Sequence, residues 1–389
     1  MHSSVSALRF QLTTMMDKSV NMTPSQANYN CNMRVLFICG REVDYTRNQV
    51  LLRALRRISQ VDAVVETGIT KSLIYRSARL SLRSFPKLIT KRYDLVFVGF
   101  YGHLLMIPAG LLSKRPILFD AFVSTYDTLT SDRRQFSPGS LMGRMAMLLD
   151  RSACHLADKV LLDTPTHEQY FSSVLGVPQN KLFSLPVSCN EDIFYPRTSS
   201  PYNKNTQVLG YSTYLPMHGM QTIILAADIL KNEPIQFKLI GQGPLYNSVV
   251  DKANDMGLKN VTFSPPIALD ELADEISGAD ICLGGHFGVS DKANRVVPGK
   301  IYQMLAMRKP VIAADTAANK ELLKHGVSTY FCPAGNPEAL ADAILCLHRD
   351  RGLREQISNG GRETYEKYCS EAVVTEKLGK LIVEMINSN

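Results

Sequence analysis

The chain has 389 residues, of which 45% are hydrophobic, and a formal net charge of +7. This length suits two or three domains with cores of their own. The positive excess lies in the first half, because residues 33–200 carry 22 Lys and Arg against 14 Asp and Glu, whereas residues 201–389 carry 19 against 21. No aromatic-interleaved basic motif accompanies it, which argues against a nucleic-acid partner.

Residues 1–32 are polar and lack the apolar core of a signal peptide, so we expect a disordered tail. The longest apolar run, residues 95–112, contains His103 and Pro108. It suits a buried strand and helix better than a membrane span, which needs about 20 clean apolar residues. The eight cysteines form no C-x-x-C pair, which favours a reducing, cytoplasmic compartment.

Strand and helix patterns alternate through residues 33–187, which predicts a doubly wound parallel sheet in a first domain. The expected strands are 34–39, 63–66, 95–100, 117–119 and 159–162, and the expected helices are 48–57, 74–85, 104–113 and 141–157. Gly40 follows the first strand without the G-x-G-x-x-G pattern of dinucleotide dehydrogenases, which disfavours that class.

Residues 188–205 lack periodicity and are rich in turn formers, so we predict a linker there. The alternation resumes in a second domain, residues 206–367, and residues 368–389 form a last helix that can cross back to the first domain. The expected strands are 208–211, 237–240, 261–263, 281–283, 311–313 and 328–331, and the expected helices are 219–231, 244–256, 269–277, 299–307, 317–324, 336–349 and 371–386.

A basic segment precedes the third strand of the first domain. No acid occurs between Glu66 and Asp94, and Arg76, Arg79 and Arg83 share one side of the predicted helix beside an apolar face. Such a helix can contact an anionic membrane surface. The alternative is an ordinary packed helix with a solvated basic face.

Glycines and cations follow the strands of the second domain. Gly241 and Gly243 lie between a strand and a helix start, where small residues let a phosphate approach free N–H groups; a plain tight turn is the alternative. Gly285 and Gly288 follow another strand, at the edge where such sheets bind ligands. The segment after them supplies the cations of a diphosphate clamp, Lys292, Arg295 and Lys300. A solvated run of charges is the alternative.

Four blocks in this order resemble the C-terminal domain of the family 4 (group 1) glycosyltransferases over residues 206–350. They read GYSTYLPMHGMQTIILA, LIGQGP, VTFSPPIALDELADEISGADICL and PGKIYQMLAMRKPVIAADTAANKELL. The resemblance implies a GT-B fold, in which two Rossmann-like α/β domains face each other across a cleft. It also implies a nucleotide-diphosphate sugar as donor, a retaining reaction and no obligatory metal. The absence of any D-x-D triplet agrees with the last point.

The resemblance also suggests roles for single residues, with departures. The family's Arg and Lys fall on Thr213 and His218, and its Glu-x7-Glu pair falls on Arg295 and Gln303. Gln303 can still accept a hydrogen bond from the ribose, and Lys292, Arg295 and Lys300 can replace the lost cations. The segment that contains Pro266 and Ile267 would flank the base.

The first domain lacks the family's catalytic-face His, since Phe122 stands at that position. Asp120 and Asp127 follow the strand there and can orient an acceptor hydroxyl, although carboxylates after strands are often loop caps. His103 is the other catalytic candidate, and a structural His is its alternative. Asp163 to His167 suggest a helix N-cap first and a cleft-lining loop second.

Together these patterns predict a retaining glycosyltransferase that uses a nucleotide sugar and no metal. The basic helix favours a lipid-linked or polysaccharide acceptor, reached by a cytoplasmic enzyme at the inner face of the membrane. Two alternatives stay open: a sugar-nucleotide epimerase or hydrolase on the same fold, and a non-catalytic subunit that binds sugar nucleotides.

Overall fold

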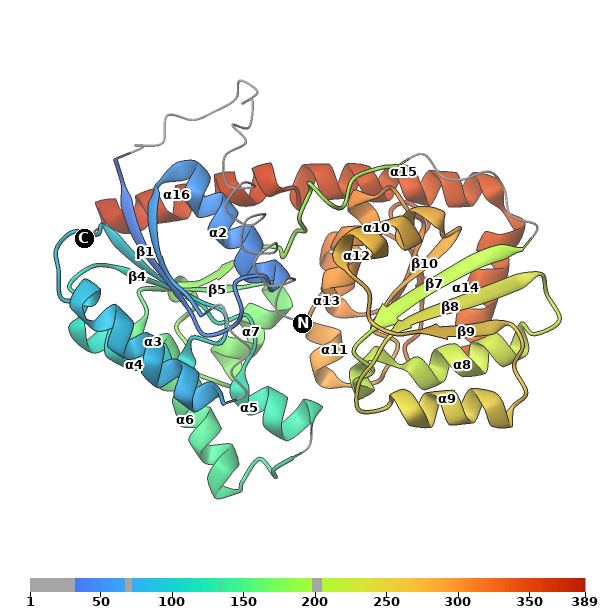
Figure 1. The fold of residues 1–389 in the computed structure, drawn as a ribbon, viewed down its shortest axis with the longest axis horizontal. Coiled ribbons are helices and arrows are strands. Elements are labelled where there is room, and N and C mark those ends of the chain that lie inside the picture. Colours follow the sequence, from blue (N-terminus) through green and yellow to red (C-terminus); the bar gives the residue numbers. More distant parts are fainter. Residues whose placement is uncertain (1–31, 67–71, 134, 198–204, 389) are drawn as a thin grey trace, which may run out of the picture.

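The computed structural model describes residues 32–66, 72–133, 135–197 and 205–388. It contains two six-stranded parallel sheets, each covered by helices on both faces, and the two α/β units lie side by side (Figure 1). The two-domain α/β expectation is therefore confirmed. The predicted tail falls almost entirely on residues 1–31, outside the described residues.

The first sheet has the strand order β2-β1-β3-β4-β5-β6. Its strands are β1 Arg34–Cys39, β2 Gln60–Val64, β3 Leu95–Gly99, β4 Ile117–Asp120, β5 Lys159–Leu162 and β6 Leu182–Ser184. Its helices are α2 Thr46–Ile58, α3 Leu73–Leu88, α4 His103–Leu112, α5 Thr125–Asp127, α6 Leu141–Leu156 and α7 Pro165–Ser173, with a π-helical turn at Thr128–Asp132 and a 3-10 turn at Gln179–Lys181.

Alternate residues of these strands face opposite helical layers, as the two-residue period of a strand requires. Leu36 and Ile38 pack with side chains of α3, α4, α6 and α7 in one core. Val35 and Phe37 pack on the other face with α2 and with α16, Glu371–Asn387. The last helix of the chain thus completes the first domain, and it runs along one edge of the molecule after α15 (Figure 1).

The second sheet has the strand order β12-β11-β10-β7-β8-β9. Its strands are β7 Thr206–Ser212, β8 Ile235–Gly241, β9 Val261–Ser264, β10 Ile281–Gly285, β11 Val311–Ala314 and β12 Tyr330–Cys332. Its helices are α8 Met220–Ile229, α9 Tyr246–Asp255, α10 Leu269–Gly278, α11 Asp291–Arg295, α12 Gly299–Ala306, α13 Ala317–Leu322, α14 Pro337–Arg349 and α15 Arg351–Tyr368, with a 3-10 turn at Pro216–His218.

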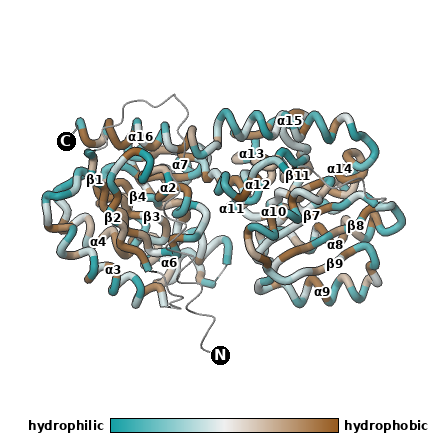
Figure 2. The backbone as a smooth tube through the Cα atoms, turned by 45° about the horizontal axis from the view of Figure 1, so that its top comes forward, coloured by the Kyte–Doolittle hydropathy of each residue, from teal (hydrophilic) through white to brown (hydrophobic). Residues whose placement is uncertain are grey.

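The chain leaves β7 toward β8 and β9, and then returns to the other side of β7 with β10, β11 and β12. The strand order therefore reverses between β7 and β10, and ligands of open α/β sheets bind at the carboxyl ends of the strands beside such a point. In Figure 2 hydrophobic residues are concentrated on the strands inside each domain. In the described part of the chain, no helix combines the length and apolarity needed to cross a membrane.

Several elements differ from the sequence prediction. Strand β6 and helix α11 were not predicted. Helix α3 does not end at Pro86 but continues to Leu88. Strand β2 begins at Gln60 rather than at residue 63 because it pairs in register with Arg34 and the residues after it. Helix α15 was not predicted, since its three glycines weaken the helix pattern.

Candidate active site

The loops after β7 and β10 meet backbone to backbone at the point where the strand order reverses. A Cβ atom on Gly219 would lie 2.3 Å from the backbone N of Gly288, and one on Gly288 would lie 2.2 Å from the carbonyl oxygen of Pro216. Gly219 also has a φ of 65°. Only glycine allows this approach, so the two loops form one rigid wall.

The loop after β8 joins the same wall. A Cβ atom on Gly241 would lie 1.9 Å from the carbonyl oxygen of Ser212, and one on Gly243 would lie 1.8 Å from that of Thr213. Gly241 also has a φ of 129°. The close approach of these backbones is sufficient to require glycine at both positions. Thr213, the predicted donor residue directly after β7, is exposed.

Two histidines stack on this wall, one of which was not predicted. The rings of His218 and His286 lie 5.2 Å apart, and Nδ1 of His218 accepts from the backbone N–H of Leu215. Burial, together with nearby ammonium groups, lowers the pKa of His218 to about 3 and that of His286 well below its usual value. Both rings are neutral at pH 7. Nδ1 of His286 is buried and has no hydrogen-bond partner among the described residues.

Lys300 and Gln303 lie one turn apart at the start of α12, beside β7. Nζ of Lys300 donates to the carbonyl oxygen of Tyr211 at 2.6 Å. Burial lowers its pKa to about 8, and no ion pair joins it to a carboxylate in the described part of the chain. Oε1 of Gln303 accepts from the hydroxyl of Tyr211 at 2.6 Å. The predicted ribose ligand is thus already engaged within the protein.

The other two cations of the predicted clamp reach the first domain instead. Arg295 donates to Oδ1 of Asp127 at 2.7 Å, and Lys292 donates to Oδ2 of Asp132 at 3.1 Å. All four groups are largely buried. Of the three predicted clamp cations, Lys300 alone has no carboxylate partner among the described residues, while Arg295 and Lys292 form ion pairs between the two domains.

Helix α7 adds further contacts between the domains. The hydroxyl of Thr164 donates to the carbonyl oxygen of Arg295 at 2.6 Å, and the backbone N–H of Thr166 donates to Glu321 at 2.8 Å. The side chain of Thr164 also accepts from the N–H of His167. The structure therefore combines both interpretations of this segment, as a helix N-cap and as part of the domain contact.

The structure does not place Asp120 and His103 as the sequence suggested. Asp120 is fully buried in an ion pair with Arg47, 2.9 Å apart, so it faces the interior and cannot orient an acceptor. His103 is also buried, with Nε2 3.5 Å from Oδ1 of Asp150. Burial lowers its pKa, which leaves a neutral structural ring.

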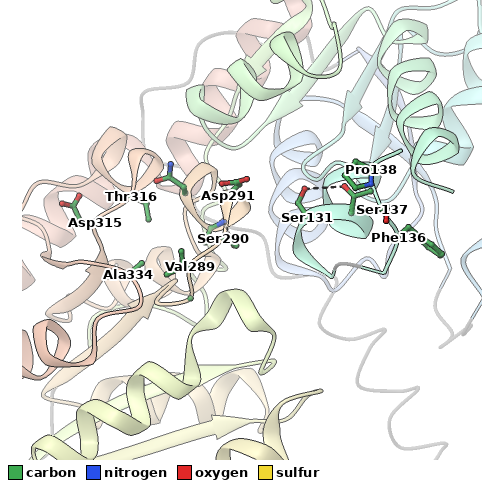
Figure 3. Close-up of a pocket in the computed structure, with 14 residues that line it drawn as sticks. Ser131, Phe136, Ser137, Pro138, Val289, Ser290, Asp291, Asp315, Thr316 and Ala334 are labelled. Atoms are coloured by element: carbon green, nitrogen blue, oxygen red, sulfur yellow. Dashed lines mark hydrogen bonds between the residues drawn. The ribbon is translucent and has the colours of Figure 1, made fainter. Parts of the chain in front are cut away.

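A cavity of about 790 Å³ opens between the domains beside this wall, and Figure 3 shows residues of both domains around it. From the first domain it is lined by Thr130, Ser131, Phe136, Ser137 and Pro138, and from the second by residues 288–291, Ala293, Asn294, Asp315, Thr316 and Ala334. Among the predicted site residues only Gly288 lines it. The hydroxyls of Ser131 and Ser137 were missed because their loop carries no motif.

The remaining predicted residues, Pro266, Ile267 and Gly285, do not line the cavity. Pro266 is exposed, and Ile267 is half-buried against a core of the second domain. Gly285 ends β10 with a φ of 69°. In the described ranges no group of three or more His, Cys, Asp or Glu side chains could hold a metal ion.

The predicted membrane arginines are mostly paired with acids. Arg76 is buried and pairs with Glu42 at 2.7 Å. Arg79 and Arg83 are half exposed, and both pair with Glu66. Arg76 is therefore no surface cation, because the helix turns it toward the sheet, and Arg79 and Arg83 are partly neutralised.

Comparison with known proteins identifies the architecture. Residues 206–350 match the family described as glycosyl transferases group 1. This match covers the second domain, which resembles the group 1 glycosyltransferases. The chain is 24% identical over 334 residues to the probable glycosyltransferase WbjE of Pseudomonas aeruginosa. That alignment covers 80% of this chain and 73% of WbjE. The chain is 21% identical over 231 residues to the amylovoran biosynthesis glycosyltransferase AmsK of Erwinia amylovora. That alignment covers 58% of this chain and 56% of AmsK, so the chain spans about half the length of that relative.

Solved structures confirm the GT-B fold of this chain. HepE of Anabaena, in complex with UDP, superimposes with a TM-score of 0.69 at 14% identity, over 90% of this chain and all of HepE. Sucrose-phosphate synthase of Thermosynechococcus elongatus does so with a TM-score of 0.72 at 17% identity, over 92% of this chain and all of the synthase. At these identities the likeness establishes the fold alone.

Proposed function

We propose that this glycosyltransferase transfers a sugar from a nucleoside diphosphate to an acceptor hydroxyl, with retention at the anomeric carbon and without a metal. The observation that carries the proposal is Lys300: a half-buried ammonium at the ligand-binding edge of the second sheet, with a depressed pKa and no carboxylate partner in the described ranges. An anion bound there would further stabilise the charged form, because an opposite charge raises the pKa of an ammonium. The donor diphosphate supplies such an anion.

The two histidines suit the same ligand. A neutral imidazole can donate one N–H to a phosphate oxygen, and His218 and His286 feel the charge of Lys300 directly. Nδ1 of His286 is a buried polar atom without a partner among the described residues, which is costly unless a ligand or water satisfies it. We assign the three side chains to the donor diphosphate.

The transfer step needs no protein nucleophile. The acceptor oxygen forms a bond to the anomeric carbon while the bond from that carbon to the donor phosphate breaks. The acceptor proton passes to the departing phosphate oxygen on the same face, which leaves a nucleoside diphosphate and the new glycoside. Lys300 stabilises the charge that develops on that phosphate, which is electrostatic catalysis by a positioned group.

The acceptor would enter the cavity between the domains, where Ser131 and Ser137 of the first domain face Ser290 and Asp291 of the second (Figure 3). We propose a glycan or a lipid-linked molecule as acceptor, used at the inner face of an anionic membrane. The cytoplasmic assignment is supported by the seven described cysteines, all of which are free.

The test is calorimetric binding of UDP, the nucleotide present in the similar HepE structure. Lys300→Ala should weaken UDP binding by about 10- to 100-fold, as expected for a charge-assisted hydrogen bond. Lys259→Ala, which removes an exposed cation on the far side of the sheet, should leave it unchanged. Equal affinity in both variants would refute the assignment of Lys300.

A second measurement separates the rival activities. With a UDP-sugar as donor, release of UDP should require added acceptor, and the product should keep the anomeric configuration when followed by NMR. Release without acceptor would indicate a hydrolase or epimerase, and tight UDP binding without turnover would indicate a non-catalytic subunit.

A further inference from the structure

One helical layer of the first domain exposes large apolar side chains to solvent. Helices α3, α4 and α6 lie next to one another over the same face of the first sheet, with α4 in the middle (Figure 1). Their exposed members include Leu82 of α3 (77% exposed), Leu111 of α4 (74%) and Leu141 of α6 (75%). The others are Leu73, Ile74, Tyr75, Phe85, Ile107, Met142, Met145 and Leu148. Apolar patches of this extent usually mark an interaction surface.

The charge of this layer is one-sided. The three helices contain a single acidic residue, Asp150, which is buried and accepts from Ser124. The exposed cations on or directly after them include Lys91, Arg92, Lys114, Arg144 and Arg151. Neither Arg144 nor Arg151 forms an ion pair with a carboxylate of the described residues. The surface therefore fits a partner that is both anionic and apolar.

A hollow of about 280 Å³ opens on α6 within this surface. Arg144, Met147, Leu148 and Arg151 line it at helical spacings of three, four and seven residues, which places them on one face of the helix. Tyr126 and Pro138 close the opposite side. Arg144 and Arg151 both border the hollow, and one guanidinium nitrogen of Arg151 also donates to the carbonyl oxygen of Val174 at 3.1 Å. Arginine binds phosphate through its remaining N–H donors.

The hollow adjoins the cavity between the domains. Pro138 lines both, and in Figure 3 it lies beside Ser137 at the edge of the larger cavity. A molecule whose phosphate lies between Arg144 and Arg151 can thus extend past Pro138 toward the donor site. Its apolar part would remain on the exposed side chains of α6.

We propose that this hollow binds the phosphate of a long-chain lipid phosphate that serves as, or carries, the acceptor, while the outer faces of α3, α4 and α6 rest on the bilayer. The assignment of this lipid as acceptor rests on the proposed glycosyl transfer. A bilayer is favoured over a free anion because the arginines stand beside the apolar stripe of Leu141, Met145 and Leu148, which a free phosphate does not cover.

The test is co-sedimentation with phosphatidylcholine vesicles that contain either dodecyl phosphate or dodecanol, which differ only in the head group. Wild-type protein should pellet with the phosphate vesicles alone. Arg144→Gln/Arg151→Gln should weaken this binding by about 30-fold. Arg349→Gln/Arg351→Gln removes the same charge from the second domain, where both side chains are exposed, and should bind as the wild type does.

Each other outcome overturns the proposal. Equal binding to both vesicles would exclude phosphate recognition, and equal losses in the two double variants would show an effect of net charge only. Binding of inorganic phosphate in calorimetry without any binding to the vesicles would indicate a free-anion site. Melting temperature and UDP affinity are measured on the same samples. If the wild-type protein does not bind UDP, the proposed donor site is refuted, whereas the result with the vesicles is judged separately.

Discussion

Arg295 of α11 donates to Asp127 of α5 at 2.7 Å, so a residue expected to hold the donor and one expected to act on the acceptor bind each other. The guanidinium also lies 4.2 Å from the ring centroid of Tyr170 in the first domain. Together with the pair of Lys292 and Asp132, this ion pair neutralises four charges between the domains. Their first role is to fix how the two sheets face each other.

A double-mutant cycle tests this contact. Asp127→Ala, Arg295→Ala and the double variant should show a coupling of about 1–3 kcal/mol in the free energy of unfolding by urea, because the pair is largely buried. The exposed pair Arg351–Glu355 is the matched control and should couple by less than about 0.5 kcal/mol. Equal coupling in both pairs would contradict a fixed domain contact.

Asp120 should prove structural. Asp120→Ala leaves the guanidinium of Arg47 buried and uncompensated, which should lower the free energy of unfolding by about 3–5 kcal/mol. Thermal unfolding and UDP binding are measured together. A variant that keeps its stability and its UDP affinity but loses sugar transfer would restore the catalytic interpretation of this carboxylate.

The glycine wall gives a paired prediction. Gly243→Ala places a Cβ atom 1.8 Å from the carbonyl oxygen of Thr213, so the backbone must shift, and both melting temperature and UDP affinity should fall. Gly278→Ala, at the end of α10, meets no atom within 4 Å and should be neutral or slightly stabilising. The prediction fails when the two variants behave alike.

The pH dependence of donor binding should follow Lys300. Its pKa of about 8 in the unliganded protein lies below the usual range of lysine, so the ammonium loses its proton as the pH rises through 8. UDP needs the protonated form, and its affinity should fall by up to about tenfold per pH unit above 8. Lys300→Arg, which does not titrate in this range, should remove the slope. Equal slopes in calorimetric titrations between pH 7 and 10 would assign it to another group.

Metal chelation should have no effect on transfer. The sequence has no D-x-D triplet to carry Mg²⁺ or Mn²⁺ to the diphosphate, and Lys300 is proposed to supply the positive charge instead. UDP release is compared before and after treatment with EDTA. Loss of activity that added Mn²⁺ restores would contradict the metal-free mechanism.

The sequence by itself determined most of the elements and the sheet edge at which the donor site is proposed. Continuous apolar runs such as residues 34–39 and 159–162 became strands with those bounds. Glycines directly after strands marked the loops that meet at this edge, because backbone periodicity and turn chemistry act over a few neighbouring residues. The same local rules predicted Thr164 as a helix cap. They failed for α15, where Gly360 is required by the carbonyl oxygen of Val327, only 2.2 Å from its Cβ position.

The tertiary structure alone decided which charges remain available. Lys292 and Arg295 look like Lys300 in the sequence, but carboxylates 160 and 168 residues away neutralise them. In the same way, Arg47 forms an ion pair with Asp120, which lies 73 residues away in the sequence. Spacing along the chain cannot reveal such partners, because the order of strands in a sheet and the facing of two domains bring them together, and burial then fixes the partner of each charge.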